Sequence, residues 1–193
     1  MPKMQDLEQV EVTSVKELRK WFEQNHGQKE SIWLVTYKKN VPDNYVSIKE
    51  VLDEVLCFGW MDGRRMKLDD KRTMQLLSPR KSGHWAKSYK DRVAILTKAG
   101  RMHQAGLNAV ETAKKNGMWD FMNDVDALIK PDDLIKALEK YPPAMENYEA
   151  FPDSSKRDIL RWIKIAKKPE TRAKRIKKTA ELAAKNERAS GIS

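Results

Sequence analysis

Apolar and polar residues follow two different periods in the first half of the chain. Apolar residues recur every three or four positions in residues 14–27 and 47–58, each behind a capping box, so we expect two amphipathic helices there. The boxes are Ser14 with Glu17 and Ser47 with Glu50. The run SIWLVTYKK, residues 31–39, predicts a strand buried on both faces. Alternation on either side of DDK in residues 64–80 predicts a β-hairpin.

The second half of the chain shows only the helical period. We expect a helix from about Trp85 that stops at Gly100, a second over residues 104–115, and a short third that Pro131 opens. Two more helices follow, with apolar stripes at Ile159, Leu160, Ile163 and Ala166 and at Ala173, Ile176, Ala180 and Ala183. The sequence therefore predicts an α+β fold, with a small sheet and packed helices in residues 1–125 and a helical module in residues 126–193.

Positive charge is concentrated near the carboxyl end. The chain has a net charge of +10, and residues 154–188 hold thirteen Lys and Arg against four acidic residues. The cations that face away from the apolar stripes are Lys167, Lys168, Arg172, Lys174, Arg175, Lys177 and Lys178. Such a face either binds a polyanion, such as nucleic acid or an anionic membrane surface, or is an ordinary solvated helical surface. No recognised nucleic-acid-binding motif accompanies it.

The segment EVLCFGWMDG, residues 54–63, has both a structural and a chemical interpretation. Structurally it is a helix end, with Gly59 in the left-handed cap position and Asp62-Gly63 as a turn into the hairpin. Chemically, Cys57 is a poor nucleophile in the last helical turn, where the helix dipole disfavours a thiolate. Asp62 beside Trp60 either orients a ligand or forms the turn.

The segment SPRKSGHW, residues 78–85, connects the hairpin to the next helix. Arg80 and Lys81, with backbone amides at Ser82 and Gly83, would suit a phosphate, and His84 lies next to them. The alternative is a basic loop, since the glycine spacing of a true phosphate-binding loop is absent. We therefore expect any pocket to lie between Trp60 and Asp62 on one side and Arg80, Lys81 and His84 on the other.

Several classes of protein are disfavoured by composition. The single cysteine and three scattered histidines give neither a disulfide nor a metal-ligand spacing, and no cofactor motif is present. No apolar run approaches the roughly 18 residues of a membrane span. The first residues, MPKMQDLEQVEVTS, contain no apolar signal segment. We expect a cytoplasmic protein without metal or cofactor.

The order of EVLCFGWMDG, LDD, SPRKSGHW, AGRMHQAGLNAVE and RDILRWIKIAKKPETRAKRIKK closely resembles the bacterial YdeI/OmpD-associated family, from about Ser14 to Lys178. The family's helix end usually reads F-G-W-I-D-G, and this chain has Met61 in place of the isoleucine. The resemblance implies a carboxy-terminal OmdA domain, protection against bacteriocins or antimicrobial peptides, and association with an outer-membrane porin. It implies no catalytic residue set.

The charge of the chain limits how such protection would work. Most antimicrobial peptides are cationic, so a protein of charge +10 repels them within a Debye length of about 8 Å. We expect a non-enzymatic protection or stress protein that binds an anionic ligand or a protein partner. The alternatives are an enzyme for a small phosphorylated or sugar-like ligand at Trp60 and Asp62, and non-specific nucleic-acid binding by the basic helices.

Overall fold

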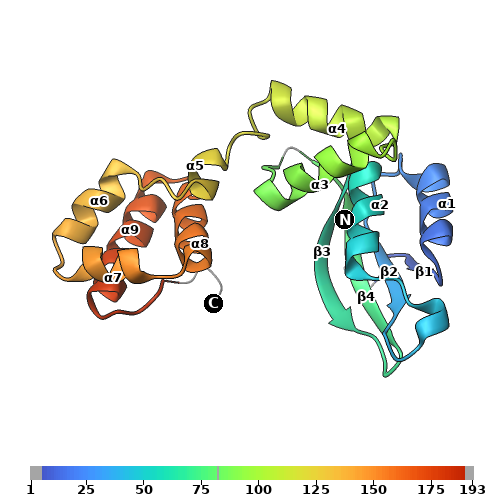
Figure 1. The fold of residues 1–193 in the computed structure, drawn as a ribbon, viewed down its shortest axis with the longest axis horizontal. Coiled ribbons are helices and arrows are strands. Elements are labelled where there is room, and N and C mark those ends of the chain that lie inside the picture. Colours follow the sequence, from blue (N-terminus) through green and yellow to red (C-terminus); the bar gives the residue numbers. More distant parts are fainter. Residues whose placement is uncertain (1–5, 82, 190–193) are drawn as a thin grey trace. The chain divides into compact units, whose positions relative to one another are not determined.

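The computed structural model describes residues 6–81 and 83–189 and divides the chain into two compact units, residues 1–120 and 121–193 (Figure 1). The sequence placed this division between residues 125 and 126. Each unit has its own hydrophobic core. The predicted α+β class is confirmed, since the sheet lies in the first unit and the second is helical.

The first unit is built on a four-stranded sheet of order β1-β2-β4-β3. β1 pairs with β2 in parallel, and the remaining pairs are antiparallel. The elements of this unit are β1 (Gln9–Glu11), α1 (Val15–Asn25), β2 (Ile32–Tyr37), the 3₁₀ turn η2 (Pro42–Asn44), α2 (Ile48–Cys57), β3 (Trp60–Lys67), β4 (Arg72–Pro79), α3 (Lys87–Lys98) and α4 (Gln104–Lys115).

The strand β2 is buried on both faces, as its sequence predicts. Ile32 and Leu34 point into the main core beneath the helices. Trp33 and Val35 pack on the opposite face with Met74 of β4. A continuous apolar run is therefore needed here, because neither face of the strand meets water.

The two predicted capping boxes differ. At α2 the box is complete, since the Ser47 hydroxyl accepts from the Glu50 amide and the Glu50 carboxylate accepts from the Ser47 amide. At α1 the Ser14 hydroxyl accepts from the Glu17 amide, but the Glu17 carboxylate bonds to Thr13 instead. The box predicted at α1 is therefore only half formed, although the helix begins where expected.

The prediction of a turn at Asp62-Gly63 is wrong, because both residues lie within β3. The pairing of β3 with β4 shifts between Asp62 and Arg65, which marks an irregularity of the β-bulge type. The turn itself lies at Asp69, whose carboxylate accepts from the amides of Lys71 and Arg72. The dipeptide Asp-Gly is compatible with a β-bulge as well as with a turn, so the sequence alone could not distinguish these two structures.

The end of α2 is closed by the start of α4. Gly59 adopts the left-handed conformation expected, with φ of 71°. The His103 amide donates to the Cys57 carbonyl at 3.1 Å, which satisfies one of the last carbonyls of α2. A Cβ on Gly106 would lie 2.2 Å from that same carbonyl oxygen. Glycine at position 106 therefore allows α4 to approach the end of α2.

The second unit is arranged around α9, which contacts α6, α7 and α8. Its elements are α5 (Asn123–Asp126), α6 (Asp132–Glu139), α7 (Ala144–Ala150), α8 (Asp153–Lys164) and α9 (Pro169–Ala184). Its core contains Leu134, Leu138, Tyr148, Leu160 and Ile176 among others. Ala173, which we predicted to be part of the buried stripe of α9, is exposed, and Thr179 is buried there instead.

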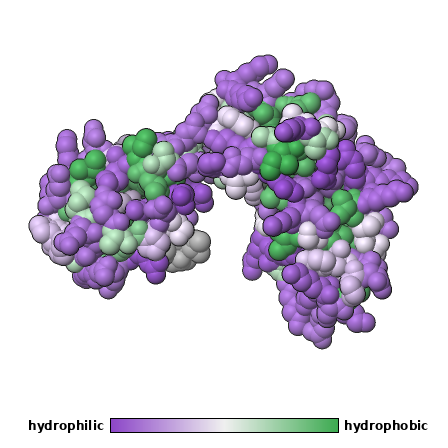
Figure 2. Space-filling view, in the orientation of Figure 1, coloured by the Kyte–Doolittle hydropathy of each residue, from purple (hydrophilic) through white to green (hydrophobic). Residues whose placement is uncertain are grey.

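On the face shown in Figure 2, most of the surface is hydrophilic, and apolar patches appear on both units. Within the described ranges, no helix is long and apolar enough to cross a membrane.

Candidate functional site: an arginine over a tryptophan

The most distinctive polar group in the first unit is the guanidinium of Arg80, directly after β4. Its Cζ lies 3.9 Å from the centre of the Trp85 ring and 5.8 Å from that of Tyr89. Its backbone amide donates to the Gly59 carbonyl at 3.1 Å, which fixes the chain at this point. The buried Nε of Arg80 has no hydrogen-bond partner among the described residues, and no carboxylate there forms an ion pair with this side chain.

The surroundings of Arg80 leave its charge incompletely compensated. Burial lowers the pKa of the guanidinium, while Tyr89 and Asp62 nearby act in the opposite direction. An arginine in a protein remains charged at neutral pH, because its ordinary pKa lies far above neutral. A bound anion would therefore restore the hydrogen bonding and charge balance that the protein itself does not provide.

Arg80 lies at the wall of a cavity of about 150 Å³. The loop contributes Arg80, Lys81, Gly83 and Trp85, and α4 with its C-cap residue contributes Ala109, Thr112, Ala113 and Asn116. Pockets for drug-sized ligands usually measure 300–1,000 Å³. This cavity therefore suits a small group, such as phosphate or the phosphoryl end of a larger molecule.

The α4 wall supplies polar groups of fixed orientation. The Thr112 hydroxyl donates to the Asn108 carbonyl at 2.8 Å, and the Asn116 side-chain oxygen accepts from the Met118 amide at 3.0 Å. With that oxygen engaged, the amide nitrogen of Asn116 is the part of the side chain left to donate. The cavity thus combines two cations with a neutral donor.

Asp62 lies next to this site but is engaged by protein groups. Its carboxylate accepts from the Tyr89 hydroxyl at 2.5 Å and more weakly from Gln75 at 3.4 Å. Burial and this hydrogen bond raise the pKa of Tyr89. Asp62 therefore holds Tyr89 beside Arg80.

The other predicted site residues are only partly brought together. Trp60 is fully buried and its indole N–H donates to the His26 carbonyl at 2.9 Å, so it belongs to the core and does not line the Arg80 cavity. Lys81 lines the cavity as predicted, whereas His84 is exposed and is not part of its lining. Ser82, whose amide we expected to contribute, lies outside the described residues.

The predicted polyanion-binding residues divide into two groups. Arg172 makes two hydrogen bonds to the Asp133 carboxylate, at 2.8 and 2.9 Å, and Arg175 donates to the Trp162 carbonyl with its guanidinium 5.1 Å from that ring. Both arginines thus stabilise the second unit. The lysines are exposed: Lys167, Lys168, Lys174, Lys177 and Lys178. Of these, Lys177 pairs with Glu181 at 3.6 Å.

Comparison with protein families assigns each unit to a separate model. A model described as "Domain of unknown function (DUF8412)" matches residues 10–109, more than half of the chain. The chain belongs to this family. A second model, "Bacteriocin-protection, YdeI or OmpD-Associated" (OmdA), matches residues 127–186. The second unit therefore carries the OmdA domain that the sequence predicted, while the upstream motifs of the resemblance lie almost entirely within the DUF8412 match.

Searches of curated proteins and of solved structures gave no match. The Arg80 cavity lies mainly within the DUF8412 match, since only Thr112, Ala113 and Asn116 of its lining fall beyond residue 109.

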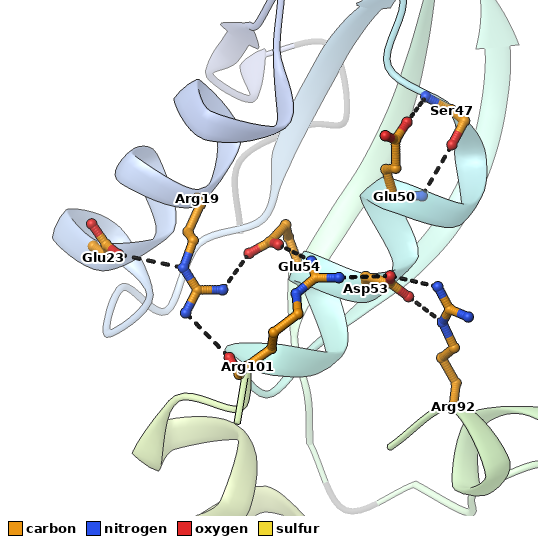
Figure 3. A network of polar contacts seen from close by, with 8 residues as sticks. All are labelled: Arg19, Glu23, Ser47, Glu50, Asp53, Glu54, Arg92 and Arg101. Carbon is orange, nitrogen blue, oxygen red and sulfur yellow. Dashed lines mark hydrogen bonds and ion pairs between the residues drawn. The ribbon is translucent and has the colours of Figure 1, made fainter. Parts of the chain in front are cut away.

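The DUF8412 domain also contains a buried ion-pair network that was not predicted from the sequence (Figure 3). Asp53 and Glu54, neighbours in α2, are 2% and 1% exposed. Arg92 and Arg101 form ion pairs with the Asp53 carboxylate. The Glu54 carboxylate pairs with Arg101 at 2.5 Å and with Arg19 at 3.0 Å. Arg19 also donates to the Arg101 carbonyl at 3.1 Å. The network joins α1, α2, α3 and, through Arg101, the segment between α3 and α4.

No local pattern marks this network in the sequence. Its carboxylates lie between apolar positions of α2, and its three arginines come from segments 35 to 48 residues away. Pairing over such distances depends on the fold, so it could be recognised only once the helices were placed. Every carboxylate in the network is already bound by arginine, which points to a structural role.

The cysteine of the DUF8412 domain is fully buried, as predicted, one turn after this network. Burial and the nearby Glu54 carboxylate raise the pKa of the Cys57 thiol to about 11. At neutral pH the residue is therefore a thiol, and thiols are weak nucleophiles. Cys57 serves packing.

Proposed function

We propose that the DUF8412 domain binds a small anion of the phosphate class at the Arg80 cavity. The observation that carries this proposal is the guanidinium of Arg80, which lies over Trp85 without a carboxylate partner among the described residues and opens on a cavity of about 150 Å³. Lys81 and Asn116 line the same cavity and add a second cation and an amide donor. Guanidinium groups are well suited to phosphate because they present paired donors in one plane.

We further propose that this binding contributes to a protection or stress role in the cytoplasm, as the description of the OmdA model suggests. The chain's charge of +10 disfavours direct capture of cationic antimicrobial peptides. Protection would then work through the anionic ligand or through a protein partner that responds to it. A protein that captured cationic toxins directly would need an acidic surface instead.

An enzyme for a phosphorylated or sugar-like ligand is the second candidate, favoured by the short hydrogen bond between Asp62 and Tyr89 beside Arg80. In that case Asp62→Asn would abolish turnover of a phosphorylated substrate and leave phosphate binding nearly unchanged. If Asp62 only positions Tyr89, the same change would weaken binding modestly, and no turnover would be found with either protein.

Binding of nucleic acid by the second unit is a third candidate, favoured by the exposed side chains of Lys167, Lys168, Lys174, Lys177 and Lys178. Binding through phosphate contacts weakens steeply with salt, with a log-log slope of about −4 to −5 for four to six contacts on duplex DNA. A gel-shift series from about 50 mM salt upward tests this. If Lys174, Lys177 and Lys178 contact phosphates, replacing them with Gln would make the salt dependence of binding less steep.

The test of the anion proposal is calorimetric titration of the full chain with inorganic phosphate. We expect saturable binding that Arg80→Gln abolishes. Arg64→Gln is the matched control, because Arg64 is exposed on β3 and forms no hydrogen bond or ion pair among the described residues, so the change removes the same charge from the same unit. Asn116→Asp provides a variant with an intact fold: its carboxylate keeps the hydrogen bond from the Met118 amide but repels an anion. Equal binding by all four proteins would overturn the proposal.

A further inference from the structure

A groove in the second unit lies between α6 and α9 and has a volume of about 580 Å³. Both of its walls come from this unit, and the two helices pack against each other beneath it. The residues that line it are Asp133, Lys136, Ala137, Lys140, Tyr141, Pro169, Arg172, Ala173, Ile176 and Lys177. It is separate from the Arg80 cavity, with which it shares no residue.

The floor of the groove is apolar, and its apolar residues are spaced as on one face of a helix. Ala137 and Tyr141 on one wall, and Pro169, Ala173 and Ile176 on the other, recur every three or four residues. The α9 wall runs from position 169 to position 177, which is about 12 Å at 1.5 Å per residue. The groove therefore accommodates about two turns of a partner helix.

The rim of the groove is positively charged. Lys136 and Lys140 are exposed and form no ion pair among the described residues, and Lys177 pairs only with Glu181 at 3.6 Å. The one carboxylate in the lining, Asp133, is neutralised by its two hydrogen bonds with Arg172. Those bonds also lower the pKa of Asp133, so the pair stays ionised at neutral pH.

The apolar floor and the positively charged rim restrict which kind of molecule can bind in the groove. A cationic peptide and a second copy of this chain, which carries +10, would both meet repulsion at the rim. A nucleic acid backbone would use the lysines but not the apolar floor. An acidic amphipathic helix satisfies both, with apolar side chains at i, i+3 or i+4 and i+7 on the floor and carboxylates at the rim.

We propose that the groove between α6 and α9 docks an acidic amphipathic helix of a partner protein. The OmdA domain would then be a protein-binding module, and its basic surface would select acidic segments. This inference does not depend on anion binding by the DUF8412 domain, because the two sites lie in different units.

The test uses the full chain and a fluorescein-labelled peptide of fourteen residues, a length chosen to give about four turns. Leu occupies positions 1, 4, 8 and 11 of this probe and Glu most others, and binding is measured by anisotropy. A peptide of the same composition in scrambled order and one with Lys in place of Glu serve as controls. We expect saturable binding of the acidic amphipathic peptide and little binding of either control.

Two double variants with the same charge change and the same i, i+4 spacing locate the site. Lys136→Gln with Lys140→Gln removes cations from the rim and should weaken binding about tenfold, by loss of two charge interactions. Lys174→Gln with Lys178→Gln removes exposed cations of α9 that do not line the groove, and should change affinity less than about twofold. Ala173→Asp, at an exposed position of the floor, should abolish binding without unfolding the unit.

Three outcomes would overturn the proposal. One is equal weakening by both lysine pairs together with equal binding of the scrambled peptide, which would indicate attraction by charge alone. Another is binding of a single-stranded DNA 14-mer that exceeds peptide binding and falls with the Lys174 and Lys178 changes. The third is no peptide binding at the highest concentration at which the protein and peptide remain soluble.

Discussion

At the scale of single residues, Cys57 combines complete burial with a thiol whose pKa is raised to about 11. Replacing it by Ser would bury a hydroxyl in an apolar core, so we expect Cys57→Ser to destabilise the first unit by roughly 1–3 kcal/mol. Chemical denaturation followed by circular dichroism measures this. Native protein should also react slowly with a thiol reagent at pH 8, and rapid labelling would show that Cys57 is accessible.

Cys57 also makes the free energy of unfolding depend on pH, and the direction of that dependence follows from its raised pKa. In the unfolded chain a cysteine ionises near pH 8.5, and in the folded protein only near pH 11. Between these values the unfolded state has lost a proton that the folded state retains, so the contribution of Cys57 to stability is full below pH 8.5 and falls by roughly 1.4 kcal/mol per pH unit. The stability difference between wild type and Cys57→Ala should shrink over this window. A constant difference would contradict the buried thiol.

At the scale of elements, the contact between the end of α2 and the start of α4 leaves no room for a side chain at Gly106. A Cβ there would force the two elements apart, so Gly106→Ala should cost about 1–3 kcal/mol or more. Gly27→Ala is the control, because nothing lies within 4 Å of the added Cβ and its φ is not positive. It should change the free energy of unfolding by less than about 1 kcal/mol. Equal effects would argue against close packing at Gly106.

The ion-pair network is a second link between elements. Asp53→Asn would leave Arg92 without its buried carboxylate, and removal of one partner of a buried pair typically costs about 3–5 kcal/mol. Asp91→Asn breaks an exposed pair with Lys87 and should cost less than about 0.5 kcal/mol. Thermal and chemical denaturation of both variants measures the difference. A small effect for Asp53→Asn would mean that water replaces the lost partner.

The elements show what the sequence could and could not predict. The strand of residues 31–39, the hairpin and the helix over 104–115 depend on local patterns and are confirmed. The helix α7 and the irregularity in β3 between Asp62 and Arg65 depend on packing, and no local sequence pattern predicted them. For the site, Arg80 and Lys81 come together as predicted because they are neighbours in the chain. The opposite wall of the cavity comes from α4, which reaches Arg80 only through tertiary contacts, and Trp60 does not line this cavity.

At the scale of the whole molecule, the two units have separate cores. A cavity in one core should therefore destabilise that unit alone. Leu134→Ala removes a fully buried side chain of the second unit and should cost about 2–5 kcal/mol there. Hydrogen exchange should then accelerate in residues 121–189 and stay unchanged in residues 6–81 and 83–120. Faster exchange in both units would show that they unfold together.

The central claim is that a phosphate-class anion binds at Arg80, and amide chemical shifts recorded by NMR during titration with inorganic phosphate test it most directly. The account predicts saturable shifts at Arg80, Lys81, Gly83, the Trp85 indole and the Asn116 side chain, all lost in Arg80→Gln and retained in Arg64→Gln. Shifts confined to the exposed lysines of α9, or the same shifts at the cavity in Arg80→Gln, would contradict it.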